Sequence, residues 1–172
     1  MLGDFLRKVF RGLSPDQYLN SIFEIDFDDL KKRGIKALLL DVDNTLKPHY
    51  AKAPAANVRG WLDDARAAGL AMCIVSNGLQ GRIEPFAHDL GLSAIGEAMK
   101  PSRKGFILAA KHLGFEIHET AVVGDQIFTD VIGGKLAGSF TILVKPISKD
   151  EPFYLRLKRP FEKLVLIRKK KL

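Results

Sequence analysis

The sequence is poor in the features that mark several classes of protein. It has one cysteine, Cys73, among 172 residues, which excludes an internal disulfide framework and a zinc site built from cysteines. No apolar run approaches the roughly 18–20 residues that a membrane-spanning helix needs. The N-terminus has scattered charges and no small-residue cleavage site, so it is unlike a secretory signal. We therefore expect one globular domain over residues 1–172, located in the cytoplasm, with Cys73 buried in an apolar segment.

Charge is distributed unevenly along the chain. Hydrophobic residues make up 47% and charged residues 27%, which is typical of a globular protein. Residues 1–144 contain 17 basic and 17 acidic side chains, whereas residues 145–172 contain 10 and 3, so the net charge of +7 arises after Val144. A basic terminal segment suits an anionic partner, either a lipid surface or a nucleic acid, although a solvated, solubilising end has the same composition.

Apolar runs alternate with segments of helical periodicity. Helices are expected between the runs, the first of them from Pro54, and each tends to end in glycine. This alternation predicts a doubly wound α/β fold with a parallel sheet. In such sheets ligands bind at the carboxyl ends of the strands, near the point where the strand order reverses. Buried strands are predicted at residues 35–40, 70–75, 120–123 and 140–144.

Two aspartates directly follow the first predicted strand. Asp41 and Asp43 are two positions apart, so in extended backbone their side chains point the same way. Carboxylates that face one spot repel each other unless a cation or a proton lies between them. Mg²⁺ accepts oxygen ligands and commonly binds one or two carboxylates together with phosphate. Alone, this pattern is more typical of a turn than of a catalytic centre.

Three further polar sites lie near strand ends. Ser76 and Asn77 end the second strand, where a hydroxyl and backbone N–H groups can hold phosphoryl oxygens. Lys100 precedes a predicted helix and offers a positive charge for phosphate. Asp125 and Asp130 add two carboxylates after the third strand. The joint occurrence of the four sites, in this order, favours chemistry over a set of unrelated turns.

These motifs resemble those of the haloacid dehalogenase (HAD) phosphatases. A narrower resemblance, over nearly the whole chain, is to the bacterial YqeG-type HAD-IIIA phosphatases, whose relatives in mitochondria and plastids are phosphatidylglycerophosphate phosphatases. One departure is Gly78, where many members would have a second asparagine. The resembling segments are Leu13-Ser14-Pro15, Ser21-Ile22-Phe23, Asp41-Val42-Asp43-Asn44-Thr45-Leu46, Ser76, Lys100-Pro101, Gly124-Asp125-Gln126-Ile127-Phe128-Thr129-Asp130 and Thr141-Ile142-Leu143-Val144.

The resemblance implies a role for each motif residue. Asp41 would attack phosphorus and form an aspartyl-phosphate, and Asp43 would protonate the leaving alcohol and then deprotonate the attacking water. Mg²⁺ would bind the Asp41 carboxylate, the Asp43 backbone carbonyl and Asp125. Asp130 would orient metal-bound water. His49 is not required, and we expect it on a surface loop. The phosphoryl group would be held by Thr45, Ser76, the Asn77 backbone and Lys100.

The spacing of the motifs predicts an open site. HAD enzymes often have a cap domain inserted between motifs, but here Asp41 to Ser76 spans 35 positions and Ser76 to Lys100 spans 24. Neither gap is long enough for a cap with its own core. An open site suits a phosphate presented by something large, such as a membrane, a protein or a nucleic-acid end.

Both chain ends have apolar stripes beside basic residues. Helical spacing predicts amphipathic basic helices at about 1–13 and 153–171, which suit either an anionic membrane surface or packing on the core. Together with the resemblance, they favour a phosphatidylglycerophosphate phosphatase, peripheral on the inner face of the cell membrane, that acts on a lipid headgroup. The sequence predicts no oligomeric state.

Two alternatives stay open from the sequence. One is a phosphatase for a phosphoprotein or a nucleic-acid end, held by the basic tail. The other is a low-turnover binding protein on the same fold, which the intact motif carboxylates argue against. Aliphatic terminal stripes favour lipid over polymer, because polymer-binding sites use charge and aromatic faces.

Overall fold

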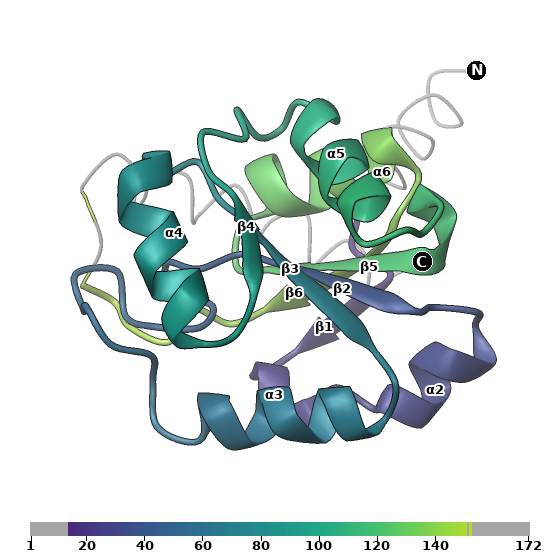
Figure 1. The fold of residues 1–172 in the computed structure, drawn as a ribbon, viewed down its shortest axis with the longest axis horizontal. Helices are drawn as coiled ribbons and strands as arrows, with labels where there is room; N and C mark the ends of the chain where they lie inside the picture. Colours follow the sequence, from purple (N-terminus) through teal and green to yellow (C-terminus); the bar gives the residue numbers. More distant parts are fainter. Residues whose placement is uncertain (1–13, 151, 153–172) are drawn as a thin grey trace, which may run out of the picture.

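Six parallel strands form one open sheet in the computed structural model, which describes residues 14–150 and 152 (Figure 1). They are β1 (Gln17–Leu19), β2 (Ala37–Leu40), β3 (Ala71–Val75), β4 (Ser93–Ile95), β5 (Thr120–Gly124) and β6 (Phe140–Val144). Their order in space is β1-β6-β5-β2-β3-β4. The expected doubly wound parallel sheet is therefore confirmed, and the four predicted apolar runs correspond to β2, β3, β5 and β6.

Helices cover both faces of the sheet. Figure 1 shows α2 and α3 on one side and α5 and α6 on the other. The helices are α2 (Phe27–Lys32), α3 (Val58–Ala67), α4 (Gln80–Asp89), α5 (Lys104–His112) and α6 (Ile132–Ala137), with 3-10 turns η1 (Ile22–Glu24) and η2 (Ile117–Glu119) and a π-helical turn η3 (Ile127–Val131). This layering explains why the central strands are apolar on both faces rather than alternating with polar residues.

The central strand β2 contributes to two separate cores. Leu38 and Leu40 pack with α3, whereas Leu39 packs with α5 on the other face, and every residue of the strand is buried. Complete burial of one leucine side chain contributes about 1.5–3 kcal/mol. Cys73 on β3 is also fully buried, as expected. Packing from both sides fixes the strand and therefore the position of Asp41, which directly follows it.

The strand order reverses beside β2. From β2 the chain continues to β3 on one side, and after β4 it returns to pair β5 with the other side of β2. Such a reversal leaves a crevice at the carboxyl ends of the strands. The residues that follow β2, β3 and β5 are thereby brought to one edge of the sheet.

No cap domain interrupts the described chain. Only α3 and β3 lie between Asp41 and Ser76, and only α4 and β4 lie between Ser76 and Lys100. Within residues 14–150 and 152, we find no helix with both the length and the apolar character needed to cross a bilayer. The predicted helices at about 1–13 and 153–171 lie outside the described residues.

Some local expectations need correction. The helix expected from Pro54 begins at Val58, because Asn57 adopts a left-handed conformation (φ 65°) that a helix cannot include. Strand β1 and helix α2 were not predicted. The strand has three residues and no apolar run, and the helix is short and mostly charged, so neither has the periodicity that marks a longer element.

Candidate active site

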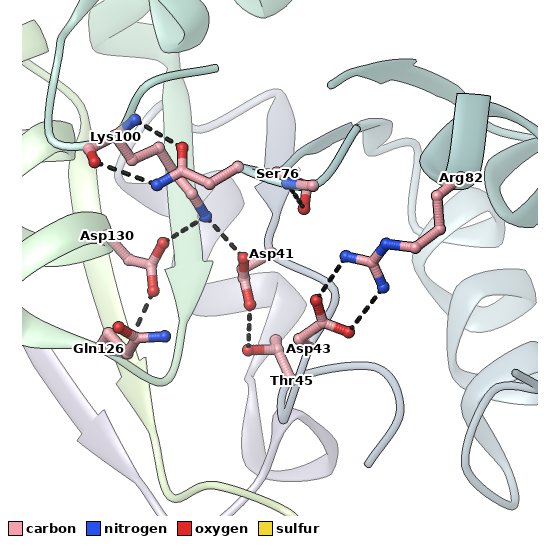
Figure 2. A network of polar contacts seen from close by, with 10 residues as sticks. Asp41, Asp43, Thr45, Ser76, Arg82, Lys100, Gln126 and Asp130 are labelled. Atoms are coloured by element: carbon pink, nitrogen blue, oxygen red, sulfur yellow. Dashed lines mark hydrogen bonds and ion pairs between the residues drawn. The ribbon is translucent and has the colours of Figure 1, made fainter. Parts of the chain in front are cut away.

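Three strand ends bring the predicted motif residues together (Figure 2). Asp41 directly follows β2, Ser76 follows β3 and Asp125 follows β5. Lys100 lies in the loop between β4 and α5 and reaches the same place. Asp41, Asp43, Ser76 and Lys100 line an open cavity of about 950 Å³. Asp41 and Lys100, which are 59 positions apart in the sequence, therefore face one crevice, where an α/β sheet is expected to bind its ligand.

A buried ammonium joins two of the aspartates. Lys100 Nζ lies 2.6 Å from Asp41 Oδ1 and 2.6 Å from Asp130 Oδ1. Burial raises the pKa of Asp41, the Lys100 charge opposes this, and the balance is a pKa of about 6. Burial alone lowers the pKa of Lys100, but the adjacent carboxylates more than offset it, so its pKa is raised. Lys100 therefore stays positively charged at the base of the cavity.

Three carboxylates converge at this point. Oxygen atoms of Asp41, Asp125 and Asp130 all lie within 4.8 Å of one another, and all three residues are buried. One ammonium cannot neutralise three carboxylates, so the cluster keeps excess negative charge if all are ionised. Clustered carboxylate oxygens are the donors that a hard divalent cation prefers. The residues present therefore fit a divalent metal.

Gly124 makes room for the third carboxylate. A Cβ atom at this position would overlap the Asp130 carboxylate, so only glycine permits the approach. Asp130 also accepts a hydrogen bond from the Gln126 backbone N–H at 3.1 Å. The π-helical turn η3, which contains Asp130, directs its side chain back onto the end of β5. The Gly-Asp-x-x-x-x-Asp spacing thus has a steric basis.

The Asp43 carboxylate points away from this cluster. Lys47 Nζ lies 2.5 Å from its Oδ1, and the Arg82 guanidinium contacts both oxygens at 3.3 and 2.8 Å. Burial raises the pKa of Asp43, but hydrogen bonds from Arg82 and Lys47 outweigh it, so the pKa is lowered. The backbone carbonyl of Asp43 is the atom that the resemblance assigns to the metal, and the side chain is paired elsewhere.

Sequence reasoning missed both cationic partners of Asp43. Lys47 is buried four residues after Asp43, and Arg82 belongs to the first turn of α4. Neither position belongs to a motif that sequence analysis singled out, and an arginine in a helix usually indicates a solvated face. The adjacency of Lys47 to the first motif was the one signal available, because a lysine four residues away can return to a carboxylate across a turn.

The remaining predicted residues hold the site in shape. The Thr45 hydroxyl donates a hydrogen bond to Asp41 Oδ2 at 3.1 Å. The Asn77 side chain donates to the Lys100 carbonyl at 3.1 Å and accepts from the Lys100 N–H at 2.6 Å. Ser76 accepts a hydrogen bond from the Gly78 N–H at 3.1 Å. The loop after β3 is therefore tied directly to the loop that supplies Lys100.

His49 lies on a loop and is half-buried, as expected, and it lines the cavity together with Tyr50. The two rings meet edge to face, with centroids 4.8 Å apart. They belong to the loop that follows the first motif, which forms one wall of the cavity.

Comparison with known proteins agrees with this geometry. The haloacid dehalogenase-like hydrolase family matches residues 28–138, which include Asp41, Ser76, Lys100 and Asp125 with their motifs. The chain belongs to this family. A solved HAD-fold phosphatase, the cobalt-bound deoxy-D-mannose-octulosonate 8-phosphate phosphatase from Haemophilus influenzae, is similar with a TM-score of 0.53 and 18% identity, covering 79% of this chain and 90% of that one.

Two curated relatives of this HAD-like protein are more informative about activity. A probable phosphatase, YqeG of Bacillus subtilis, is 34% identical over 94% of this chain and 92% of its own length. Phosphatidylglycerophosphate phosphatase 1 of Arabidopsis thaliana is 30% identical over 90% of this chain, but the match covers 47% of the plant protein. The HAD-like protein is therefore a phosphatase that acts on a phosphorylated substrate.

Proposed function

We propose that this HAD-like phosphatase is a Mg²⁺-dependent phosphomonoester hydrolase that acts through an aspartyl-phosphate and removes the terminal phosphate of phosphatidylglycerophosphate. The observation that supports the chemistry is the convergence of buried Asp41, Asp125 and Asp130 around the Lys100 ammonium. A nucleophile, a cation and oxygen donors for a hard metal then share one crevice.

The chemistry proceeds in two displacements. An Asp41 oxygen attacks phosphorus, and the bond between phosphorus and the alcohol oxygen breaks. Asp43, in the protonated form that requires release from a cationic partner, gives its proton to that oxygen. Asp43 then takes a proton from water, whose oxygen attacks phosphorus and releases inorganic phosphate and Asp41. Asp41, Asp125 and the Asp43 carbonyl would hold Mg²⁺, which would supply positive charge that reduces repulsion between nucleophile and phosphate.

The other motif residues hold the transferring group. Lys100 neutralises charge on the phosphoryl oxygens, while the Ser76 hydroxyl and the Asn77 backbone donate hydrogen bonds to them. The Thr45 hydroxyl, which donates a hydrogen bond to Asp41, lies beside the same phosphoryl oxygens. Asp130 keeps Lys100 in position through the 2.6 Å ion pair, and it would orient a water at the metal site.

The surroundings of the cavity support a lipid substrate. Tyr50 lines the cavity and is 69% exposed, and exposed Leu79 and Met99 are the chain neighbours of lining residues Gly78 and Lys100. Large apolar side chains around an open site suit contact with the apolar part of a bilayer. The Arabidopsis relative is named for phosphatidylglycerophosphate, the lipid that we propose here.

The chain after β6 also starts beside the site. The Ile147 N–H donates a hydrogen bond to the Asn44 carbonyl in the first motif loop. Lys145 and Lys149, which flank Ile147 and are exposed, therefore lie on a stretch of chain that contacts this loop. Positive charge at this place favours an anionic surface, by about 1 kcal/mol for each basic residue close to the bilayer. We infer a peripheral location on the inner face of the cell membrane.

A phosphate-release screen tests the substrate. It compares phosphatidylglycerophosphate in micelles with phosphopeptides and with 5′- and 3′-phosphorylated oligonucleotides, each with Mg²⁺ and with a chelator. We expect hydrolysis of the lipid, lost on chelation and restored by Mg²⁺. Faster release from a peptide or an oligonucleotide would replace the lipid with that polymer as the substrate.

The nucleophile has its own test. Asp41→Asn should abolish turnover while keeping the fold, because an amide cannot form the acyl-phosphate. Circular dichroism of the variant checks the fold. Appreciable release of phosphate by a pure Asp41→Asn preparation would overturn the mechanism.

A further inference from the structure

Arg82 spans the mouth of the cavity from α4 to the first motif loop (Figure 2). Its two terminal nitrogens contact both oxygens of Asp43, at 3.3 and 2.8 Å, in a two-pronged arrangement. Lys47 Nζ lies 2.5 Å from one of the same oxygens. Both oxygens of Asp43 are therefore engaged by cationic donors.

The two cations differ in their freedom to move. The Lys47 side chain is 4% exposed and also donates to the His49 carbonyl at 3.1 Å, so it is fixed in the loop. The Arg82 side chain is 48% exposed and lines the cavity. Side chains at the surface change rotamer on the picosecond to nanosecond timescale. Arg82 is therefore the partner of Asp43 that can leave when a ligand enters.

Gly78 permits the contact between Arg82 and Asp43. A Cβ atom at position 78 would overlap the Arg82 guanidinium and lie 2.9 Å from Ile83 Cδ1. Asparagine, the residue that the resemblance led us to expect here, would push the guanidinium away from Asp43. This departure from the family pattern thus has a structural correlate, the placement of Arg82 at the cavity mouth.

The proposed chemistry requires Asp43 to approach the oxygen of the leaving alcohol. Asp43 Oδ1 already accepts from Lys47 and Arg82, and Oδ2 accepts from Arg82, so the leaving alcohol competes with Arg82 for this carboxylate. A guanidinium that moves off a carboxylate binds best to another planar or tetrahedral anion, through paired N–H donors. The part of the substrate nearest to Asp43 is the leaving alcohol, so an anion there is the natural new partner.

We propose that Arg82 is a specificity residue that exchanges Asp43 for a phosphodiester in the alcohol part of the substrate. The preferred substrates are then phosphomonoesters whose alcohol also contains a phosphodiester, whether this belongs to a lipid or to a water-soluble molecule. This inference rests on the proposed function, because it assumes that Asp43 serves the leaving group. It goes further by assigning recognition of a second anion to Arg82.

The main experiment uses a matched pair of water-soluble esters with Mg²⁺. One is deacylated phosphatidylglycerophosphate, and the other has a neutral methylphosphonate in place of the diester. The wild type should prefer the charged ester in kcat/KM by roughly ten- to a hundredfold, the range for hydrogen bonds to a charged group. Arg82→Gln should reduce this ratio to near one through a rise in KM, and Arg82→Lys should restore part of it. An unchanged ratio in Arg82→Gln overturns the proposal.

Two variants separate anion recognition from a merely structural role. Gly78→Ala keeps Arg82 but moves it off Asp43, so it should retain the preference for the charged ester. If Gly78→Ala loses the preference for the charged ester as Arg82→Gln does, Arg82 acts only through its contact with Asp43. The proposal is then wrong. Arg103→Gln, at an exposed arginine before α5, is the matched control and should leave the ratio unchanged.

A lipid arm and a binding arm complete the test. The acylated lipid in micelles should show the same dependence on Arg82, and a dependence seen only in micelles would mean contact with the lipid surface instead. The deacylated product, glycerophosphoglycerol, retains the diester without the terminal phosphate. Calorimetry should show about tenfold weaker binding of this product to Arg82→Gln than to the wild type, and equal binding overturns the inference. Since this arm needs no turnover, failure of the proposed chemistry is recognised separately.

Discussion

Lys100 places its ammonium 2.6 Å from the carboxylate of Asp41, a residue 59 positions earlier in the chain. The side chains are 3% and 10% exposed, so both charges are almost fully removed from water. Desolvation of buried charges costs several kcal/mol for each ion, and a buried pair often gives no net stability. A contribution to folding therefore does not account for the pair, which is consistent with the role in phosphate chemistry that we propose for it.

Removal of the ammonium should destabilise the metal-free protein. Lys100→Met leaves Asp41 and Asp130 buried without their shared cation, which typically costs about 3–5 kcal/mol. Urea denaturation in the presence of a chelator measures the loss. Lys104→Met, at an exposed lysine of α5, is the control and should change the free energy of unfolding by less than about 0.5 kcal/mol. Equal effects of the two substitutions would contradict the buried pair.

The raised pKa of Asp41 predicts a dependence of stability on pH. The native carboxyl has a pKa of about 6 against a reference of 3.8, mainly because of burial. Between these values the native state holds a proton that the unfolded chain releases, so the free energy of unfolding falls as pH rises through this window. The loss of unfolding free energy caused by ionisation of Asp41 is complete above about pH 6 and amounts to about 3 kcal/mol.

Asp41→Asn removes this penalty. The metal-free variant should be up to about 3 kcal/mol more stable than the wild type at pH 7.5, and the difference should disappear towards pH 4. Denaturation curves at several pH values with a chelator provide the measurement. A variant that is less stable than the wild type at pH 7.5 would show that burial of the ionised Asp41 carboxylate does not destabilise the native state.

Gly124 should tolerate no side chain. Gly124→Ala forces the Asp130 carboxylate to move, which breaks its pair with Lys100 and should cost about 1–3 kcal/mol of stability, the usual range for overpacking. Phosphatase activity should fall with it. Gly60→Ala is an apt control, because a Cβ there meets nothing within 4 Å and alanine favours the helix by about 0.5–1 kcal/mol. Thermal melts of both variants should therefore shift in opposite directions.

The exposed apolar residues beside the cavity should matter for lipid alone. Leu79→Ser and Met99→Asn suit the local backbone, since serine favours the start of a helix and asparagine tolerates a φ of 51°. The double variant should hydrolyse phosphatidylglycerophosphate in micelles several-fold more slowly and its deacylated form at the normal rate. A parallel loss on both substrates would place these residues in the chemistry rather than in membrane contact.

The grouping of the motif residues could be predicted from the sequence because it follows from where the strands end. Asp41, Ser76 and Asp125 each follow an apolar run, and parallel strands bring such positions to one edge of the sheet without any knowledge of side-chain contacts. The side-chain contacts within the site could not be predicted from the sequence in the same way. That the Asp43 carboxylate turns towards Arg82 depends on the close approach allowed at Gly78, which is a property of the folded loop.

Short elements at the edge of the sheet were also beyond prediction. Strand β1 has three residues, and its place beside β6 is fixed by Asp16, which accepts hydrogen bonds from the Thr141 N–H and hydroxyl, both at 2.8 Å. No local sequence pattern predicts a hydrogen-bonding partner 125 residues away. Helix α2 did have a signal, because Asp26 caps it and acidic residues precede basic ones, but its six residues fell below the length that periodicity can detect.

The pairing of Gln17 with Ile142 also constrains how the chain folds as it is synthesised. Strand β1 is made first, yet its hydrogen-bonding partner follows only after an interval on the order of ten seconds at ordinary rates of translation. Strand β2 likewise has strand partners on both sides only after β5 has been synthesised. A nascent chain that has reached α5 still exposes an open edge of β2, a surface that invites association with other strands. Completion of the sheet and assembly of the carboxylate cluster therefore belong to the same late stage of synthesis, when the last third of the chain has left the ribosome.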